Sequence, residues 1–200
     1  NFINIKNIYV FTNYPISLKK WIYKKKYKNI CIFKNISDLK KINTKFALIA
    51  NKNKDHFKFC KKLLYLGYNI LVEKPFVLNL KNHKKLIQIS KNKKLFLLLG
   101  LQFFYAYYFS YIKKKIIKKC KINNISFEWF DKKNEKKNNL LKKHDVSINY
   151  IEDVFYHIYS IVYIFLGKGS FKFGSEALTN NHVQSLVFRH NKCNISLNCS

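Results

Sequence analysis

The sequence predicts an α/β protein, with a parallel, doubly wound sheet in its first half and an α+β region with an open, mostly antiparallel sheet in its second half. Short apolar strands alternate with helices about every 20 to 30 residues through the first half, as in βαβ units. The pattern changes after residue 120, where strands follow one another more closely. We therefore divide the chain into domains at residues 1–101 and 102–200.

The chain opens with two strands separated by a helix. Strands are predicted over Asn7–Asn13 and Ile30–Phe33, because both runs are rich in β-branched and aromatic residues. The intervening helix is predicted over Ser17–Lys28, and a short helix begins at Ser37.

Two apolar runs, Phe46–Ala50 and Asn69–Val72, predict parallel strands buried on both faces. A helix between them has apolar residues at helical spacing. Asp55 is its expected N-cap, and it runs to Leu66 and stops at Gly67.

A further helix and strand complete the first half. Asn79 is the expected N-cap of a helix that runs to Asn92. The strand Leu95–Leu99 follows it.

The second half begins with a longer strand, Lys121–Phe130, and a polar, lysine-rich surface loop, Asp131–Lys143. Asn149 and Glu152 form a capping-box-like start to a helix that ends at Leu166–Gly167. Residues 171–200 then predict two or three strands, with turns near Asn180 and Asn191.

The net charge of +29 invites assignment as a nucleic-acid or membrane-surface protein, and that alternative stays open. However, every basic residue except Arg189 is lysine, spread along the chain, whereas nucleic-acid surfaces favour arginine. We attribute the lysines to an AT-rich coding sequence and expect no dedicated nucleic-acid partner. The 48% hydrophobic content is sufficient for a core and excludes global disorder.

The five cysteines are odd in number and form no CxxC, which predicts neither a disulfide framework nor a metal site and favours the cytoplasm. The stretch Leu95–Ile112 is uncharged, but its glycine and polar residues favour a strand, a loop and a helix over a membrane span. The chain begins with Asn1 rather than Met, and we expect a fragment.

Glu73-Lys74-Pro75 directly follows a predicted strand, and ligands of doubly wound sheets bind beyond such strand ends. Lys74 can donate a proton or a hydrogen bond to a substrate oxygen, and Glu73 can hold its ammonium in place. The alternative is an ordinary surface lysine.

Asp153 and His157 are four residues apart on an otherwise apolar helix, so they share a face. A carboxylate beside an imidazole forms an acid/base pair. The alternatives are a surface pair on the solvated side of the helix and, more weakly, a zinc site.

These motifs, in this order, resemble the Gfo/Idh/MocA oxidoreductases. Ala50-Asn51-Lys52-Asn53 resembles the turn after a strand in that family, and His56 and Glu73-Lys74-Pro75 follow at similar places. The run from Asp153 to His157 resembles the DxGxH helix of the family, and Gly167 matches the glycine that closes it.

The resemblance implies a Rossmann domain that binds NAD or NADP, and hydride transfer to or from a sugar, nucleotide-sugar or cyclitol. It implies catalytic roles for Lys74, His157 and Asp153, and a homo-oligomer. It also implies that the cofactor is bound by a set of residues around the strand ends: Asn13, Ala50, Asn51, Asn53, His56, Glu73 and Lys74.

The first strand and the GxGxxG turn of that family are absent from the sequence. Because that turn binds the pyrophosphate of the cofactor, we expect this chain by itself to bind dinucleotide poorly. Two alternatives therefore stay open, an inactive binding or regulatory protein and a degraded gene product.

Overall fold

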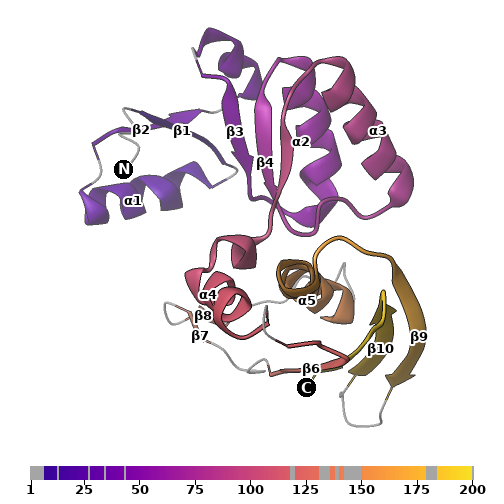
Figure 1. Ribbon diagram of the computed structural model, residues 1–200. Coiled ribbons are helices and arrows are strands. Elements are labelled where there is room, and N and C mark those ends of the chain that lie inside the picture. The colour runs from indigo at the N-terminus through magenta and orange to yellow at the C-terminus, as the bar shows by residue number, and fades with distance from the viewer. Residues whose placement is uncertain are drawn as a thin grey trace. The chain divides into compact units, whose positions relative to one another are not determined.

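The computed structural model describes residues 7–12, 14–26, 28–33, 35–42, 44–117, 120–130, 136–137, 140–141, 150–178 and 184–199 (Figure 1). The chain divides into two compact units, residues 1–45 and residues 46–200. The predicted domain boundary after residue 101 stays a prediction.

The first unit is a small βαβ arrangement. Strands β1 (Ile8–Phe11) and β2 (Ile30–Phe33) pair in parallel, with α1 (Pro15–Lys25) between them in sequence and the 3₁₀ helix η1 (Ile36–Lys41) after them. Helix α1 begins before the predicted Ser17, because the fixed φ of Pro15 suits the first turn of a helix.

The second unit begins with a parallel sheet of order β3-β4-β5, formed by Phe46–Ile49, Asn69–Glu73 and Leu97–Gly100. Helices α2 (Asn53–Tyr65) and α3 (Leu80–Asn92) both cover the same face of this sheet (Figure 1). The predicted parallel strands and their connecting helices are confirmed.

The helix ends show which predicted caps are correct. The Asn79 side chain accepts a hydrogen bond from the Asn82 N–H at 2.8 Å, as predicted. Asp55 does not cap α2, because the helix begins at Asn53 and leaves Asp55 in its first turn. A carboxylate there still interacts favourably with the helix dipole. Gly67 ends this segment with φ +85°, as its predicted stop requires.

The sheet β3-β4-β5 is buried on one face and exposed on the other, which corrects the prediction of strands buried on both faces. Its helix-covered face carries Ile49, Ile70 and Val72, all at most 5% exposed. On the opposite face, Leu48, Leu71 and Leu98 lie side by side in register and are 38–65% exposed. Within the second unit, the described residues therefore cover only one face of this sheet.

The chain continues through the 3₁₀ helix η2 (Gln102–Tyr105) and α4 (Tyr107–Lys115) to a second sheet. The strands of this sheet lie in the order β6-β11-β10-β9: Asn124–Trp129, Cys193–Cys199, Gln184–His190 and Phe171–Leu178. Strands β6 and β11 pair in parallel and the other neighbours are antiparallel, so the sheet is open and mostly antiparallel as predicted.

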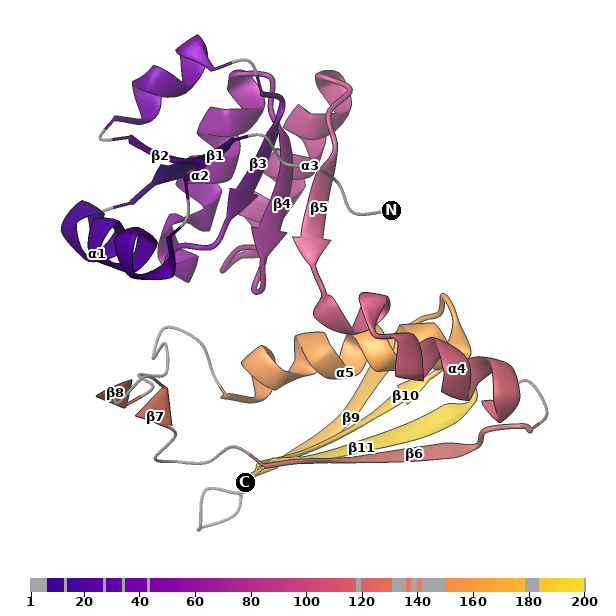
Figure 2. The same ribbon diagram turned by 90° about the vertical axis from the view of Figure 1, so that its left-hand side faces the viewer.

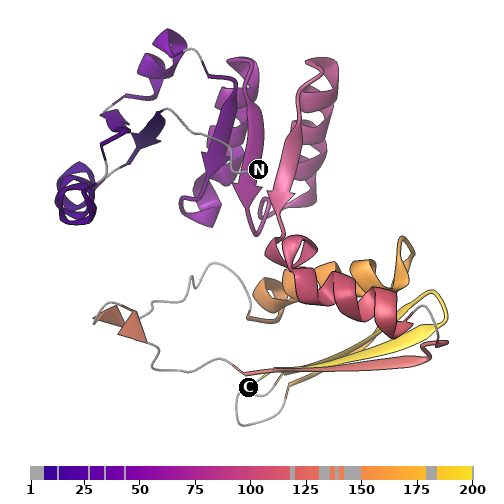
Figure 3. The ribbon, with the colours of Figure 1, turned by 60° about the vertical axis from the view of Figure 1, so that its left-hand side comes forward.

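Helix α5 (Tyr150–Leu166) lies against one face of this second sheet, on the same side as α4 (Figures 2 and 3). Ile151, Val154, Ile158 and Val162 form its buried stripe. They pack on the alternate, inward-facing residues of β10 and β11: Leu186, Phe188, Cys193, Ile195, Leu197 and Cys199.

The remaining predictions have three different outcomes. Leu95–Ile112 forms a strand, η2 and the start of α4, and none of the described helices is long and apolar enough to cross a membrane. Within the predicted loop Asp131–Lys143, the described pairs form a short ladder of β7 (Lys136–Lys137) and β8 (Leu140–Leu141). The capping residue Asn149 and the turn near Asn180 lie outside the described residues.

Leucine-to-alanine substitutions at an exposed and at a buried position should differ in their effect on the free energy of unfolding. Leu48→Ala should change the free energy of unfolding by at most about 0.5 kcal/mol, because Leu48 is 65% exposed. Leu64→Ala, at a fully buried position on α2, should cost about 2–5 kcal/mol. Urea denaturation of both variants measures this difference. Equal costs would show that Leu48 is covered in solution.

The exposed and the buried cysteines should differ in their reactivity toward Ellman's reagent. Cys31 and Cys120 are exposed, whereas Cys60, Cys193 and Cys199 are buried. Burial raises the pKa of the Cys60 thiol to about 12, so the reactive thiolate is scarce at pH 8. We expect two thiols to react in the native chain and five in denaturant. Rapid reaction of Cys31→Ser/Cys120→Ser protein would contradict this assignment.

Candidate functional site

The carboxyl ends of β3, β4 and β5 meet at one edge of the first sheet. The register pairs Ile49 with Val72 and Val72 with Leu99, so the residues that follow them lie next to one another. A Cβ atom at Gly100 would lie 3.3 Å from the Val72 carbonyl oxygen and 3.5 Å from a Glu73 carboxylate oxygen. Glycine at this position therefore leaves space for the Glu73 side chain.

His56 connects the two turns at this edge. Its ring is fully buried, with Nδ1 2.8 Å from the Pro75 carbonyl oxygen and Nε2 3.2 Å from the Asn51 carbonyl oxygen. Which nitrogen donates depends on the tautomer. A side chain with no exposed surface is suited to holding the turns after β3 and β4 in place, while its predicted role in cofactor binding stays a prediction.

Lys74 reaches from the end of β4 to α5. Its Nζ donates a hydrogen bond to the Asp153 carboxylate at 2.6 Å, across 79 residues of sequence. The expectation that Glu73 holds this ammonium is wrong, because β4 directs the exposed Glu73 toward Gly100 and Asp153 accepts from Lys74 instead. The side chains are 19% exposed for Lys74 and 42% for Asp153, so solvent reaches the pair.

The packing of α5 determines where Asp153 and His157 lie. Ile151, Val154 and Ile158 face the second sheet and are buried, and the two polar residues lie beside this stripe, both partly buried. They are one helical turn apart, about 6 Å along the helix axis. Ser160, another polar residue on this helix, donates to the Tyr156 carbonyl at 2.8 Å, which satisfies its hydroxyl locally.

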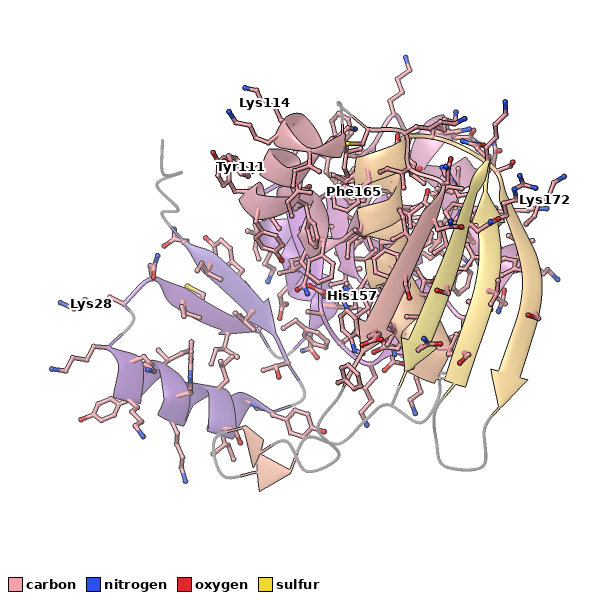
Figure 4. The ribbon with its side chains drawn as sticks, turned by 60° about the horizontal axis from the view of Figure 1, so that its bottom comes forward. Lys28, Tyr111, Lys114, His157, Phe165 and Lys172 are labelled. Carbon is pink, nitrogen blue, oxygen red and sulfur yellow. The ribbon has the colours of Figure 1, made fainter. Side chains whose placement is uncertain are left out.

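His157 lies among aromatic rings. The indole of Trp129 is stacked on its imidazole, with centroids 5.2 Å apart and planes at 2°. The ring of Phe103 meets the imidazole edge-on at 5.1 Å and 63°. Figure 4 labels His157 on α5, beside the second sheet. Neither aromatic neighbour is among the predicted site residues, although both lie near the ends of predicted strands.

The other predicted cofactor residues lie close to the same edge, with one exception. Ala50 and Asn51 are exposed immediately after β3, and Asn53 is the first residue of α2. Asn13 lies outside the described residues. The part of the chain that the structure describes contains no cluster of three or more His, Cys, Asp or Glu side chains suited to a metal ion.

A cavity of about 560 Å³ lies elsewhere, between α1 and β2 in the first unit. Its lining combines three lysines with apolar residues of the helix and the strand: Lys19, Lys26, Lys28, Ile22, Tyr23, Ile30 and Ile32. None of these is a predicted site residue. We place the candidate site at Lys74, Asp153 and His157, because these residues bring together groups capable of proton transfer.

Two lysines of the second unit illustrate how its positive charge is placed. Lys114 on α4 and Lys172 on β9 point outward from different elements (Figure 4). The absence of a nucleic-acid partner stays a prediction.

The ion pair of Lys74 and Asp153 should contribute little to the free energy of unfolding, because it is partly exposed. A double-mutant cycle of Lys74→Met and Asp153→Asn should give a coupling energy of about 0–1 kcal/mol, because solvent screens the pair. Urea denaturation of the four proteins provides this energy. Lys84 is exposed and serves as the control: Lys84→Met and Asp153→Asn should have additive effects on the free energy of unfolding. A coupling above about 3 kcal/mol would show instead that the pair is buried in solution.

Comparison with known proteins identifies the first half of the chain. A sequence model of the oxidoreductase family with an NAD-binding Rossmann fold, GFO_IDH_MocA, matches residues 6–101. The matched segment includes the strands β1 to β5 and the Glu73-Lys74-Pro75 turn.

Solved structures show the same fold over nearly the whole chain. The GenD2 protein of gentamicin A biosynthesis, in complex with NAD, has a TM-score of 0.77 at 14% identity, covering 96% of this chain and 57% of GenD2. The dehydrogenase MviM of Clostridium difficile has a TM-score of 0.74 at 18% identity, covering 94% and 59%. UDP-N-acetylglucosamine 3-dehydrogenase GnnA of Acidithiobacillus ferrooxidans has a TM-score of 0.72 at 16% identity, covering 97% and 60%.

The chain thus spans less than two thirds of the length of each of these three proteins. Identities this low establish the fold and not the reaction. The family model matches residues 6–101, and the shared fold extends through the second sheet. Residues 6–101 of the chain therefore match the Gfo/Idh/MocA family of oxidoreductases, which has an NAD-binding Rossmann fold.

Proposed function

We propose that the protein is an NAD(P)-dependent oxidoreductase that interconverts a hydroxyl and a carbonyl group on a sugar-type substrate. The observation that carries this proposal is the contact of Lys74 with Asp153, with His157 one turn further along α5. Lys74, from the half of the chain that matches the NAD-binding family, thus lies beside Asp153, and the helix of Asp153 also carries His157. The family match supports the reaction class.

The residues that follow β3 are suited to binding one part of the dinucleotide. Ala50 and Asn51 are small or polar, are exposed, and directly follow β3, where ligands of parallel sheets bind. The amino end of α2 begins beside them, and no side chain caps it, so backbone N–H groups are available there. The GxGxxG turn is missing from the sequence, so the pyrophosphate needs a further segment for binding.

The first sheet offers a place for such a segment. Among the described strands, β3 pairs only with β4, which leaves its other edge available for a parallel neighbour. The exposed row Leu48, Leu71 and Leu98 supports the same conclusion, because doubly wound sheets carry helices on both faces. We propose that a strand, a Gly-rich turn and a helix complete this sheet in the active protein.

The bound cofactor would supply or accept the hydride, and the chain would supply orientation and proton transfer. Lys74 has three N–H groups, one of which Asp153 accepts, so two stay available to the oxygen of the reacting group. Asp153 orients Lys74 through that bond. The imidazole of His157 takes up or donates the hydroxyl proton as general base or acid.

Structural relatives support a sugar-type substrate, because GnnA is named for UDP-N-acetylglucosamine and GenD2 for gentamicin A biosynthesis. This substrate class and the choice between NAD and NADP are part of the proposal. A cytoplasmic location stays a prediction.

We further propose a homo-oligomer formed through the second sheet. The face opposite α5 carries exposed, short polar side chains that bond across strands, as in Asn194 to Asn124 at 3.2 Å and Ser196 to Ser126 at 3.0 Å. Such a flat, hydrogen-bonded face can pack against a copy of itself.

Cofactor binding tests the proposal directly. Fluorescence titration with NADH and NADPH compares these 200 residues with a version extended upstream to the start of its reading frame. We expect at least about tenfold tighter binding by the extended protein, because a Gly-rich turn adds backbone donors for the pyrophosphate. Failure of both folded proteins to bind would support the inactive binding or regulatory protein.

Substitutions in the extended protein test the assigned roles. Lys74→Ala and His157→Asn should each reduce kcat by about 10²–10⁴-fold with sugar-nucleotide substrates, because each removes a proton-transfer group. Lys84→Ala, an exposed lysine on α3, is the matched control and should leave kcat unchanged. Full activity of Lys74→Ala would exclude the proposed role of this site.

A further inference from the structure

His157 and its two ring neighbours come from three separate elements of the second unit. Phe103 comes from η2, Trp129 from the end of β6, and His157 itself from the middle of α5. Along β6, exposed and partly buried residues alternate, and Trp129 belongs to the partly buried set that packs on the α5 core. Trp129 therefore lies on the face of the sheet that packs against α5.

The rings restrict the orientation of the imidazole. The indole of Trp129 covers one of its faces with planes at 2°, and Phe103 contacts it edge-on at 5.1 Å. Phe103 also contacts Trp129, at 6.5 Å and 65°, so the three rings contact one another. Without such neighbours, rotation of a histidine ring about χ2 is broad, and it changes the positions of both nitrogens.

We infer that Trp129 and Phe103 are positioning residues, which fix the plane of the His157 imidazole for proton transfer. This inference rests on the proposed function, because it assigns His157 the acid/base role. Proton transfer requires the nitrogen within hydrogen-bond reach of the substrate, and loss of about 1 Å in placement can cost about 10²-fold in rate. The stacked indole of Trp129 supplies this constraint on the imidazole plane.

The chain supplies a matched control. Phe104 is the neighbour of Phe103 in η2, is also partly buried, and meets Tyr163 edge-on at 5.5 Å. Phe103→Leu and Phe104→Leu therefore remove the same ring from the same element. Only the first removes a ring that contacts His157.

Proton NMR of the His157 ring tests the stack without cofactor or substrate. His157→Asn identifies the ring signals among those of the six histidines. We expect these signals to be shifted upfield by the indole ring current, and Trp129→Leu should move them downfield. Phe104→Leu should leave them in place. Unchanged signals in folded Trp129→Leu protein would overturn the inference, because the stack would then be absent.

Steady-state kinetics of the extended protein tests the positioning role. Trp129→Leu should reduce kcat by about 10–100-fold with little change in KM, and Trp129→Phe should retain most activity because it restores a stacking ring. Phe103→Leu should reduce kcat and Phe104→Leu should not. If Trp129→Leu moves the NMR signals but leaves kcat unchanged, positioning is excluded and the roles of Lys74 and His157 stand. If His157→Asn remains active, the acid/base assignment itself fails.

Discussion

The packing of α5 on the second sheet is the constraint on which the site depends. Ile151, Val154, Ile158 and Val162 form one buried stripe against β10 and β11, and this stripe sets the rotation of the helix about its axis. The rotation in turn determines where the neighbouring residues Asp153 and His157 lie. A helix turned by one residue, about 100°, would expose its apolar side chains and carry both polar groups away from Lys74. The apolar packing of α5 therefore determines where the side chains of Asp153 and His157 lie.

The ion pair of Lys74 and Asp153 joins elements with different structural roles. Lys74 follows β4 of the parallel sheet, and Asp153 lies on the helix of the mostly antiparallel sheet. Because solvent reaches the pair, its contribution is orientation more than stability. Around it, buried His56 connects the turns after β3 and β4, and the rings of Trp129 and Phe103 surround His157. Each polar group of the candidate site is thus supported by residues that need not contact a ligand.

The exposed leucines of the parallel sheet support the proposal that a further segment covers them. Apolar strands of a doubly wound sheet are usually covered on both faces, yet Leu48, Leu71 and Leu98 are exposed on the face opposite α2 and α3. The chain spans 57–60% of the length of GenD2, MviM and GnnA. The sequence also lacks the Gly-rich turn that binds a dinucleotide pyrophosphate. These observations are the basis of our proposal that a strand, a Gly-rich turn and a helix complete this sheet.

Local patterns in the sequence by themselves determined the order and type of most elements, because apolar periodicity and turn residues such as Asn79 and Gly67 act over a few positions. The motifs around Lys74 and His157 also indicated the family and the candidate residues. Only the tertiary structure decided that Asp153 and not Glu73 pairs with Lys74, and that Trp129 and Phe103 contact His157. These contacts join residues 28 to 79 positions apart, and no local pattern specifies them. Burial was likewise decided by the neighbours of a strand, since an apolar run is the same whether one face or both are covered.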